Sequence, residues 1–241
     1  MHWTIEEVQI AATPAVEGPL RVYFVFGALA LTTTATHWST YLVAAAAFSL
    51  LSIHAVGRTY LRFFPYPLGF LLPSLAIIAL TAPGEPVATY WVVELSDRGV
   101  DVAVTTGLRT VASLSVLSFL TLTTTAPELV AALDRLRLPD SVVELLLLVY
   151  RGIQVLVEQA TRLHTAARLR GGFRSRRSQF RTTKLLGASL LVSAVDRATA
   201  AGTAMESRNY AGRMPVSDSE NGGYLTVGAV LAVLVAARWV A

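Results

Sequence analysis

The chain has 241 residues, of which 54% are hydrophobic and 15% charged, and its formal net charge is +4. With a mean hydropathy of +0.54, it is too apolar for an ordinary soluble domain. It contains no cysteine, which excludes disulfides and thiolate metal sites.

Four long runs of the sequence carry no charge: residues 22–57, 63–84, 110–127 and 221–237. A helix needs about 20 mostly apolar residues to cross a hydrocarbon core of roughly 30 Å. The first run is too long for one span and has a polar stretch at 32–40, so we expect a helical hairpin there. The sequence thus predicts an all-α polytopic membrane protein with about five spans, at about 20–57 (two spans), 67–82, 102–125 and 222–240.

The distribution of charge predicts which side of the membrane each part faces. Residues 127–215 hold 14 of the 20 Lys and Arg residues against 7 acidic ones, a local excess of +7. The loop 83–107 is acidic, with Glu85, Glu94, Asp97 and Asp101 against Arg98. Because basic loops favour the cytoplasm, we expect 127–215 inside and 83–107 outside. The N-terminus has no basic start, so a cleaved signal peptide is not expected.

The chain therefore divides into three expected parts. Residues 1–126 form an N-terminal membrane part with four spans, 127–215 a cytoplasmic unit, and 216–241 a C-terminal transmembrane helix. In the cytoplasmic unit, Pro127 is suited to a helix start, with Thr125 as its cap.

Two long helices are predicted in the cytoplasmic unit, at about 140–170 and 180–208, with a basic turn between them. The first has one polar face, and Glu158 with Arg162 forms a favourable i,i+4 pair on it. The second has small residues four apart, namely Ala194, Ala198 and Gly202. Such spacing lets two backbones approach closely, so we expect the two helices to cross there.

An arginine-centred triplet ends each long helix: Leu169-Arg170-Gly171 on the first and Ser207-Arg208-Asn209 on the second. One interpretation is helix capping, with a cation in the last turn followed by a left-handed residue. Another is docking, because a guanidinium at a helix tip can form bidentate bonds to a carboxylate of a soluble partner. The two interpretations are compatible.

Signals for catalysis, cofactors and metals are missing from the sequence. It has no GxxxxGK[ST] phosphate loop, no HExxH or GxSxG motif, and no credible catalytic pair. His2, His37, His54 and His164 are scattered, and we expect packed or interfacial side chains rather than metal ligands. No catalytic, cofactor-binding or metal-binding residues are predicted, and the chain is not expected to be an enzyme or to bind nucleic acid.

Three features leave alternatives open. Arg109 and Arg151 lie beside apolar runs, where they are either functional groups at membrane depth or interfacial residues with their stems in lipid. The Gly171-Gly172 pair followed by four arginines either binds phosphate or anionic lipid, or is an ordinary basic cytoplasmic loop.

Five ordered motifs follow one another across residues 124–210: TTAPEL at 124–129, LRLP at 136–139, ELLLLVYR at 144–151, ARLRGG at 167–172 and AMESRNY at 204–210. With these motifs, the sequence resembles the transmembrane T component of energy-coupling factor (ECF) transporters, nearest to the cobalt transport permease branch. Ordered motifs over nearly 90 residues are far more specific than a single triplet.

The resemblance implies a scaffold in the cell membrane that joins a substrate-binding membrane subunit (S) to two cytoplasmic ECF ATPases (A). Family triplets of the Ala-Arg-Gly type insert into grooves of the ATPase pair, so Arg170 and Arg208 would be the docking residues here. Leu169 and Ser207 replace the usual alanines, and Asn209 replaces Gly or Ser. The implied cargo is a micronutrient: cobalt or nickel ion, or a vitamin such as biotin.

Two other classes of protein are weighed against this one. A stand-alone secondary transporter or channel would need intramembrane carboxylates or repeated broken helices, and the predicted spans carry almost no acids. An intramembrane enzyme would need a catalytic pair. Co-purification with an ATPase separates the first hypothesis from both.

Overall fold

The computed structural model describes residues 5–81, 86–90, 93–210 and 220–239. It divides into two compact units: a bundle unit of residues 1–132 and 218–241, and a crossed unit of residues 133–217. Each unit is described by itself.

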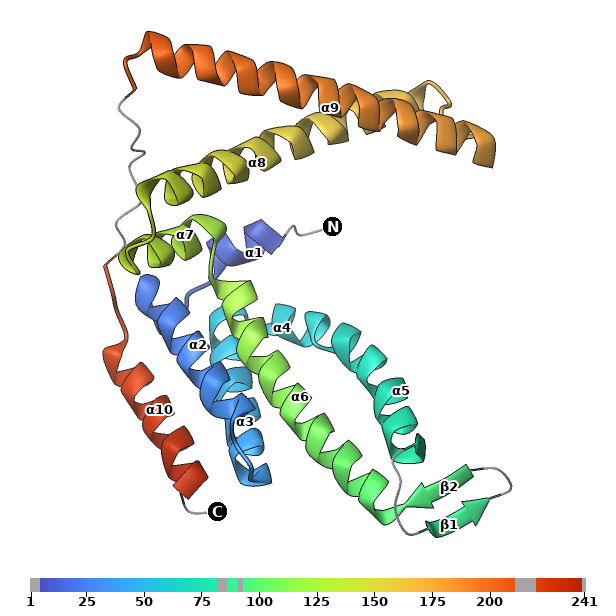
Figure 1. Cartoon of the computed structure of the whole chain (residues 1–241), viewed down its shortest axis with the longest axis vertical. Coiled ribbons are helices and arrows are strands. Elements are labelled where there is room, and N and C mark those ends of the chain that lie inside the picture. Colours follow the sequence, from blue (N-terminus) through green and yellow to red (C-terminus); the bar gives the residue numbers. More distant parts are fainter. Residues whose placement is uncertain (1–4, 82–85, 91–92, 211–219, 240–241) are drawn as a thin grey trace. The chain divides into compact units, whose positions relative to one another are not determined.

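The bundle unit is helical, apart from a small hairpin of antiparallel strands in the predicted outer loop (Figure 1). Its elements are α1 (Ile5–Ala11), α2 (Pro19–Thr33), α3 (Trp38–Val56), α4 (Arg58–Phe63), α5 (Pro65–Thr81), β1 (Pro86–Tyr90), β2 (Val93–Ser96), α6 (Asp97–Thr123) and α10 (Tyr224–Trp239).

Five apolar helices correspond to the five predicted spans, which confirms the predicted fold class. Three helical stretches are long and apolar enough to cross a membrane: Trp38–Val56, Arg58–Thr81 and Arg98–Thr123. The apolar helices Pro19–Thr33 and Tyr224–Trp239 are shorter. The fourth predicted span was placed too late in the sequence, because its helix α6 begins at Asp97 and not near residue 102.

The predicted hairpin is formed by α2 and α3, which are joined at residues 34–37. The hydroxyls of Thr32, Thr33 and Thr34 all bond to carbonyl oxygens of the preceding turn of α2. The Tyr41 hydroxyl donates to Ala35 O at 2.5 Å. The polar residues of this stretch therefore satisfy the backbone where the chain reverses.

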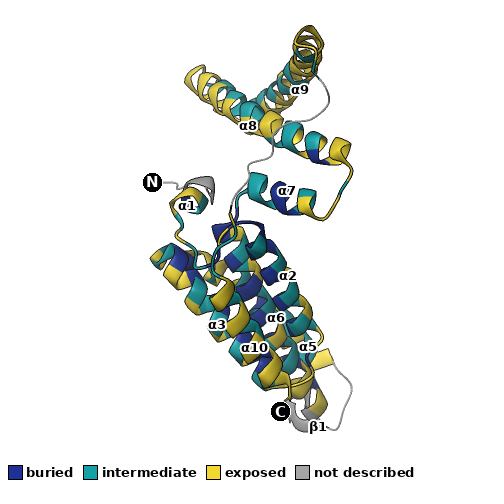
Figure 2. Ribbon diagram, turned by 90° about the vertical axis from the view of Figure 1, so that its left-hand side faces the viewer, coloured by how far each residue is buried: buried dark blue, intermediate teal, exposed yellow. Residues whose placement is uncertain are grey.

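The buried residues of the bundle unit lie on the facing sides of its helices (Figure 2), and aromatic rings are at their centre. Phe24 of α2 stacks on Phe48 of α3 with ring centroids 5.2 Å apart, and both meet the edge of Phe119 of α6. All three side chains are fully buried. Helix α5 approaches α6 closely, because a Cβ at Gly107 would lie 2.9 Å from the Leu75 side chain.

Helix α7 (Ala126–Arg135) connects the bundle unit to the crossed unit. The crossed unit itself consists mainly of α8 (Asp140–Leu169) and α9 (Arg176–Ser207). Helix α7 begins in the bundle unit and ends in the crossed unit. Helices α8 and α9 cross each other, as predicted (Figures 1 and 2). The predicted pair Arg162–Glu158 is present at 2.5 Å on the exposed face of α8.

The start of α9 was predicted wrongly. The helix begins at Arg176 and not near Phe180, because Ser175 caps it: the Ser175 side chain accepts a hydrogen bond from Ser178 N at 3.2 Å. The basic turn is therefore short, and two of its arginines, Arg176 and Arg177, are helical.

The close contact between α8 and α9 also differs from the prediction. The Ser193 hydroxyl donates to Gln159 Oε1 at 2.9 Å where the two helices touch. Ala194 is half-buried beside this contact, whereas Ala198 and Gly202 are exposed, and a Cβ at Gly202 would meet nothing within 4 Å. The spacing of small residues therefore does not mark a tight crossing beyond Ala194, because α9 has separated from α8 by that point.

Candidate functional site

The two arginine triplets lie at the C-terminal ends of the two crossing helices. Arg170 is the C-cap residue of α8, and Arg208 is the C-cap residue of α9. The residues that follow them are in the left-handed region, with φ of 74° at Gly171 and 50° at Asn209. The capping predicted from the sequence is confirmed at both ends.

The hydrogen bonds of the two ends follow the same pattern. After α8, Gly171 N donates to Arg168 O at 3.1 Å and Gly172 N to Ala167 O at 2.9 Å. After α9, Asn209 N donates to Glu206 O and Tyr210 N to Met205 O, both at 3.1 Å. Both are Schellman motifs, in which two amides beyond the helix satisfy the last carbonyls.

This backbone leaves both arginines available for binding. Arg170 and Arg208 are exposed, and neither makes an ion pair or a side-chain hydrogen bond within the part of the chain that the structure describes. Each sits at the negative end of a helix dipole, which favours a cation. The free guanidinium planes can receive carboxylates of another molecule in bidentate geometry.

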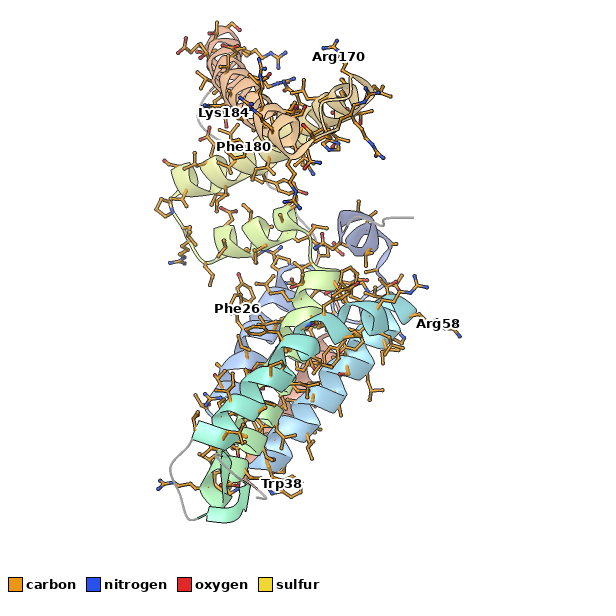
Figure 3. The ribbon with its side chains drawn as sticks, turned by 90° about the vertical axis from the view of Figure 1, so that its right-hand side faces the viewer. Phe26, Trp38, Arg58, Arg170, Phe180 and Lys184 are labelled. Carbon is orange, nitrogen blue, oxygen red and sulfur yellow. The ribbon has the colours of Figure 1, made fainter. Side chains whose placement is uncertain are left out.

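Helices α8 and α9 end at opposite ends of the crossed unit (Figure 1), and Arg170 and Arg208 are their C-cap residues. Helix α9 starts beside the turn that holds Arg170 and ends just before Arg208, and its 32 residues span about 48 Å at 1.5 Å per residue. Figure 3 shows Arg170 at the tip of α8, on a different side of the helix pair from Phe180 and Lys184 of α9. A single small groove cannot hold both arginines, so the arrangement suits two separate binding surfaces.

The turn between α8 and α9 has a fixed shape. The Gly172 carbonyl accepts hydrogen bonds from the hydroxyls of Ser178 at 2.8 Å and Thr182 at 2.9 Å. A Cβ at Gly172 would lie 2.9 Å from the Thr182 hydroxyl, so the close approach requires glycine. His164 packs on Phe173 with ring centroids 4.8 Å apart. The arginine side chains around this turn are exposed, and their binding of phosphate or anionic lipid stays a prediction.

Tyr210, just after α9, lies near the first half of α8, a proximity that the sequence analysis did not predict. The Tyr210 hydroxyl oxygen is buried and has no hydrogen-bond partner among the described residues. Burial raises the pKa of this phenol, and the nearby Glu144 raises it further. Tyr210 therefore remains protonated at physiological pH beside Glu144. Both residues lie in the resemblance motifs, but no spacing in the sequence predicts that they are close in space.

An apolar groove of about 940 Å³ opens where α8 and α9 separate. Its walls carry Leu148, Gly152 and Val155 of α8 and the small side chains Ala198 and Ala201 of α9. Three exposed arginines, Arg151, Arg197 and Arg208, also line it. Arg151, which the sequence placed beside an apolar run, is thus an exposed residue of this groove.

The other polar residues singled out in the sequence are not brought together in the described structure. Arg109 donates to Thr33 O at the end of α2, which accounts for this arginine as a helix-end contact. His37 and His54 lie at opposite ends of α3, and His2 is outside the described residues. Among the residues that the structure describes, no group of three or more His, Asp or Glu is placed to hold a metal ion.

A buried arginine in α2 was also missed. The Arg21 side chain is 5% exposed and forms an ion pair with Glu128 of α7, with Nη1 and Oε2 3.4 Å apart. It also donates to the backbone oxygens of Val16, at 2.7 Å, and Thr123. The available signal was its position, directly before a run of 36 residues without charge.

Comparisons with known proteins agree with the resemblance. The family model described as "CbiQ: Cobalt transport protein" matches residues 15–217. The chain is 32% identical over 174 residues to the cobalt transport protein CbiQ of Rhodobacter capsulatus, covering 72% of this chain and 69% of that protein. It is 27% identical over 159 residues to CbiQ of Salmonella typhimurium, covering 63% and 70% of the two chains.

Proposed function

The chain belongs to the CbiQ cobalt transport protein family, and on this premise we propose that it is the transmembrane (T) scaffold component of an ECF-type ABC importer. In this role it couples ATP hydrolysis by cytoplasmic ATPases to the uptake of a micronutrient that a separate membrane subunit binds. The family name favours cobalt as cargo. Nickel ion and a vitamin such as biotin are the other candidates.

One observation carries the proposal: two exposed arginines cap the two crossing helices in the same backbone motif, at opposite ends of the crossed unit. Equivalent, widely separated tips suit a pair of similar partners. A dimer of ATPase subunits offers two such grooves, and acidic grooves would receive Arg170 and Arg208 by bidentate hydrogen bonds. We propose that Leu169, Gly171, Ser207 and Asn209 complete the two docking surfaces.

We propose that the groove between α8 and α9 holds the substrate-binding subunit. Its wall on α9 has the small side chains that let a partner helix approach closely. Apolar side chains are also widely exposed on both helices, among them Leu145, Ile153 and Leu191, at 61%, 52% and 68%. Exposed apolar surface of this extent favours contact with another protein or with lipid. The crossed unit would lie on the cytoplasmic side of the cell membrane, because its excess of basic residues favours that side.

The test is a double variant, Arg170→Ala with Arg208→Ala, in cells that express the partner subunits. Removing a buried interfacial charge partner costs about 2–5 kcal/mol, which is about 30-fold or more in affinity for each arginine. We expect the variant to remain folded in the membrane, to lose co-purification with the ATPases, and to lose uptake.

The matched control is Arg162→Ala with Arg181→Ala, which removes one exposed arginine from each of the same helices. This control should keep assembly and uptake. Full uptake by the Arg170 and Arg208 double variant would contradict the proposal. Transport of substrate by the purified chain alone would favour the alternative, a stand-alone secondary transporter or channel.

A further inference from the structure

The ion pair of Arg21 lies where the chain leaves the bundle unit. Helix α7 continues from α6 and leads into the crossed unit. Arg21 of α2 bonds to the last residue of α6, through Thr123 O, and to Glu128 in the first turn of α7. The same carboxylate oxygen of Glu128 accepts from Thr125 N at 2.9 Å, so the Glu128 carboxylate also caps the helix.

A later residue of α7 is bonded to the same helix. The Tyr23 hydroxyl of α2 donates to Ala132 O at 2.6 Å, at the last residue of the bundle unit. Two side chains that are two positions apart on α2 thus bind the first turn of α7 and a later residue, Ala132. Helix α7 is therefore attached to α2 at two points within the bundle unit.

The returning chain is fastened to the same end of α2. Glu17 and Gly222 exchange two backbone hydrogen bonds, at 3.1 and 3.4 Å, and Leu20 N donates to Asn221 Oδ1 at 3.1 Å. A Cβ at Gly18 would lie 2.7 Å from Glu220 O, so the two segments are in direct contact. Gly222 is followed at once by α10, the last apolar helix.

Arg21 is an unusual choice for a position that only needs packing. A charge placed among apolar helices is costly unless it is fully paired, and an apolar side chain of similar volume would fill the space at lower cost. A guanidinium can do what an apolar side chain cannot: its planar donors bond to three acceptors from three different segments at once, and so fix how these segments are oriented to one another.

We propose that residues 16–23 form the junction through which movement of the crossed unit reaches the membrane helices, with Arg21 as its positioning residue. This inference rests on the proposed function, since it concerns how ATP-driven movement is passed on. The two parts of the bundle unit nearest in sequence to the crossed unit, α7 and residues 220–223, are both bonded to this one segment. A displacement of either part therefore moves α2, and with α2 the aromatic centre formed by Phe24.

The experiment compares Arg21→Met and Arg21→Lys in the complete complex, with uptake and ATP hydrolysis measured in the same vesicles. Arg21→Met leaves Arg170 and Arg208 untouched, so the complex should assemble and hydrolyse ATP. We expect uptake per ATP to fall at least about tenfold. Arg21→Lys, which keeps the charge but not the fork of donors, should recover an intermediate ratio.

Arg109→Met is the matched control. Arg109 also donates to a backbone oxygen at an end of α2, but at Thr33, the end away from these two parts. It should keep the wild-type ratio. Thermal unfolding of each purified variant serves as the check on folding. Loss of assembly or a collapsed unfolding transition in Arg21→Met would show a purely structural role and overturn the proposal, as would an unchanged ratio of uptake to hydrolysis.

A reversible cross-link gives a second test. The chain has no cysteine, so Glu17→Cys with Gly222→Cys introduces the two thiols alone. Paired residues of this kind have Cα atoms about 5.5 Å apart, within disulfide range, and a Cβ at Gly222 would meet the Glu17 side chain that the variant removes. If the junction moves as one body, oxidised and reduced forms should transport equally. Transport that stops on oxidation while hydrolysis continues would mean that the segments separate, and would overturn the proposal.

An error in the proposed function would be detected before the junction variants are tested, and by a different result. In that case the wild-type chain would neither co-purify with an ATPase nor support ATP-dependent uptake, before any variant is made.

Discussion

Asn209 shows how a departure from a family pattern can leave the backbone intact. The residue after Arg208 must adopt positive φ, and asparagine is the side chain that tolerates this region best after glycine. The departures at Leu169 and Ser207 precede the arginines and are exposed, with Leu169 at 84%. They therefore alter the surface offered to a partner and not the capping geometry.

The left-handed backbone at Asn209 makes a testable prediction. Asn209→Gly should preserve assembly with the ATPases, because glycine accepts φ near 50° without strain. Asn209→Val should weaken the end of α9 by about 1–2 kcal/mol, because a side chain with a branched Cβ is strained there. Hydrogen exchange at the Tyr210 amide, which donates to Met205 O, reports the change directly. Equal exchange in the two variants would contradict the assignment of the cap.

At the scale of helices, the sequence predicted most of what depends on composition and spacing. The uncharged runs predicted the apolar helices, and the polar stretch 32–40 predicted the hairpin. The glycine after Arg170 predicted the helix cap. It failed where position depends on a partner in space. The small residues of α9 suggested close packing, but nothing in the sequence tells a tight contact from an open groove. Arg21 was overlooked because its acceptors lie up to 107 residues away.

The groove between α8 and α9 leads to a prediction at this scale. Ala201→Leu adds bulk to the groove wall without lowering helix propensity much, so the chain should fold normally and bind the substrate-binding subunit at least tenfold more weakly. Ala188→Leu makes the same change on α9 outside the groove and should bind normally. Affinity capture of the partner from detergent solution measures both, and equal capture would show that the groove is not the binding surface.

At the scale of the whole molecule, the prediction concerns orientation. Because the chain lacks cysteine, Ser175→Cys and Asp101→Cys each introduce one reactive thiol, and both positions are exposed. A membrane-impermeant maleimide should label Asp101→Cys in intact cells, and Ser175→Cys only after the membrane is opened. This follows from the basic excess of residues 127–215. Labelling of Ser175→Cys from outside would invert the topology and remove the basis for docking to cytoplasmic ATPases.

The uninterrupted length of α9 has a mechanical consequence. A helix that is hydrogen-bonded from Arg176 to Ser207 resists both shortening and stretching, so it acts as a strut of constant length. If two bodies bound at its ends and at the tip of α8 draw together, the strut cannot absorb that change. What can change is the angle at the pivot near Gln159 and Ser193, where α8 and α9 meet. Closure of the bound pair would thus be converted into a scissor-like rotation.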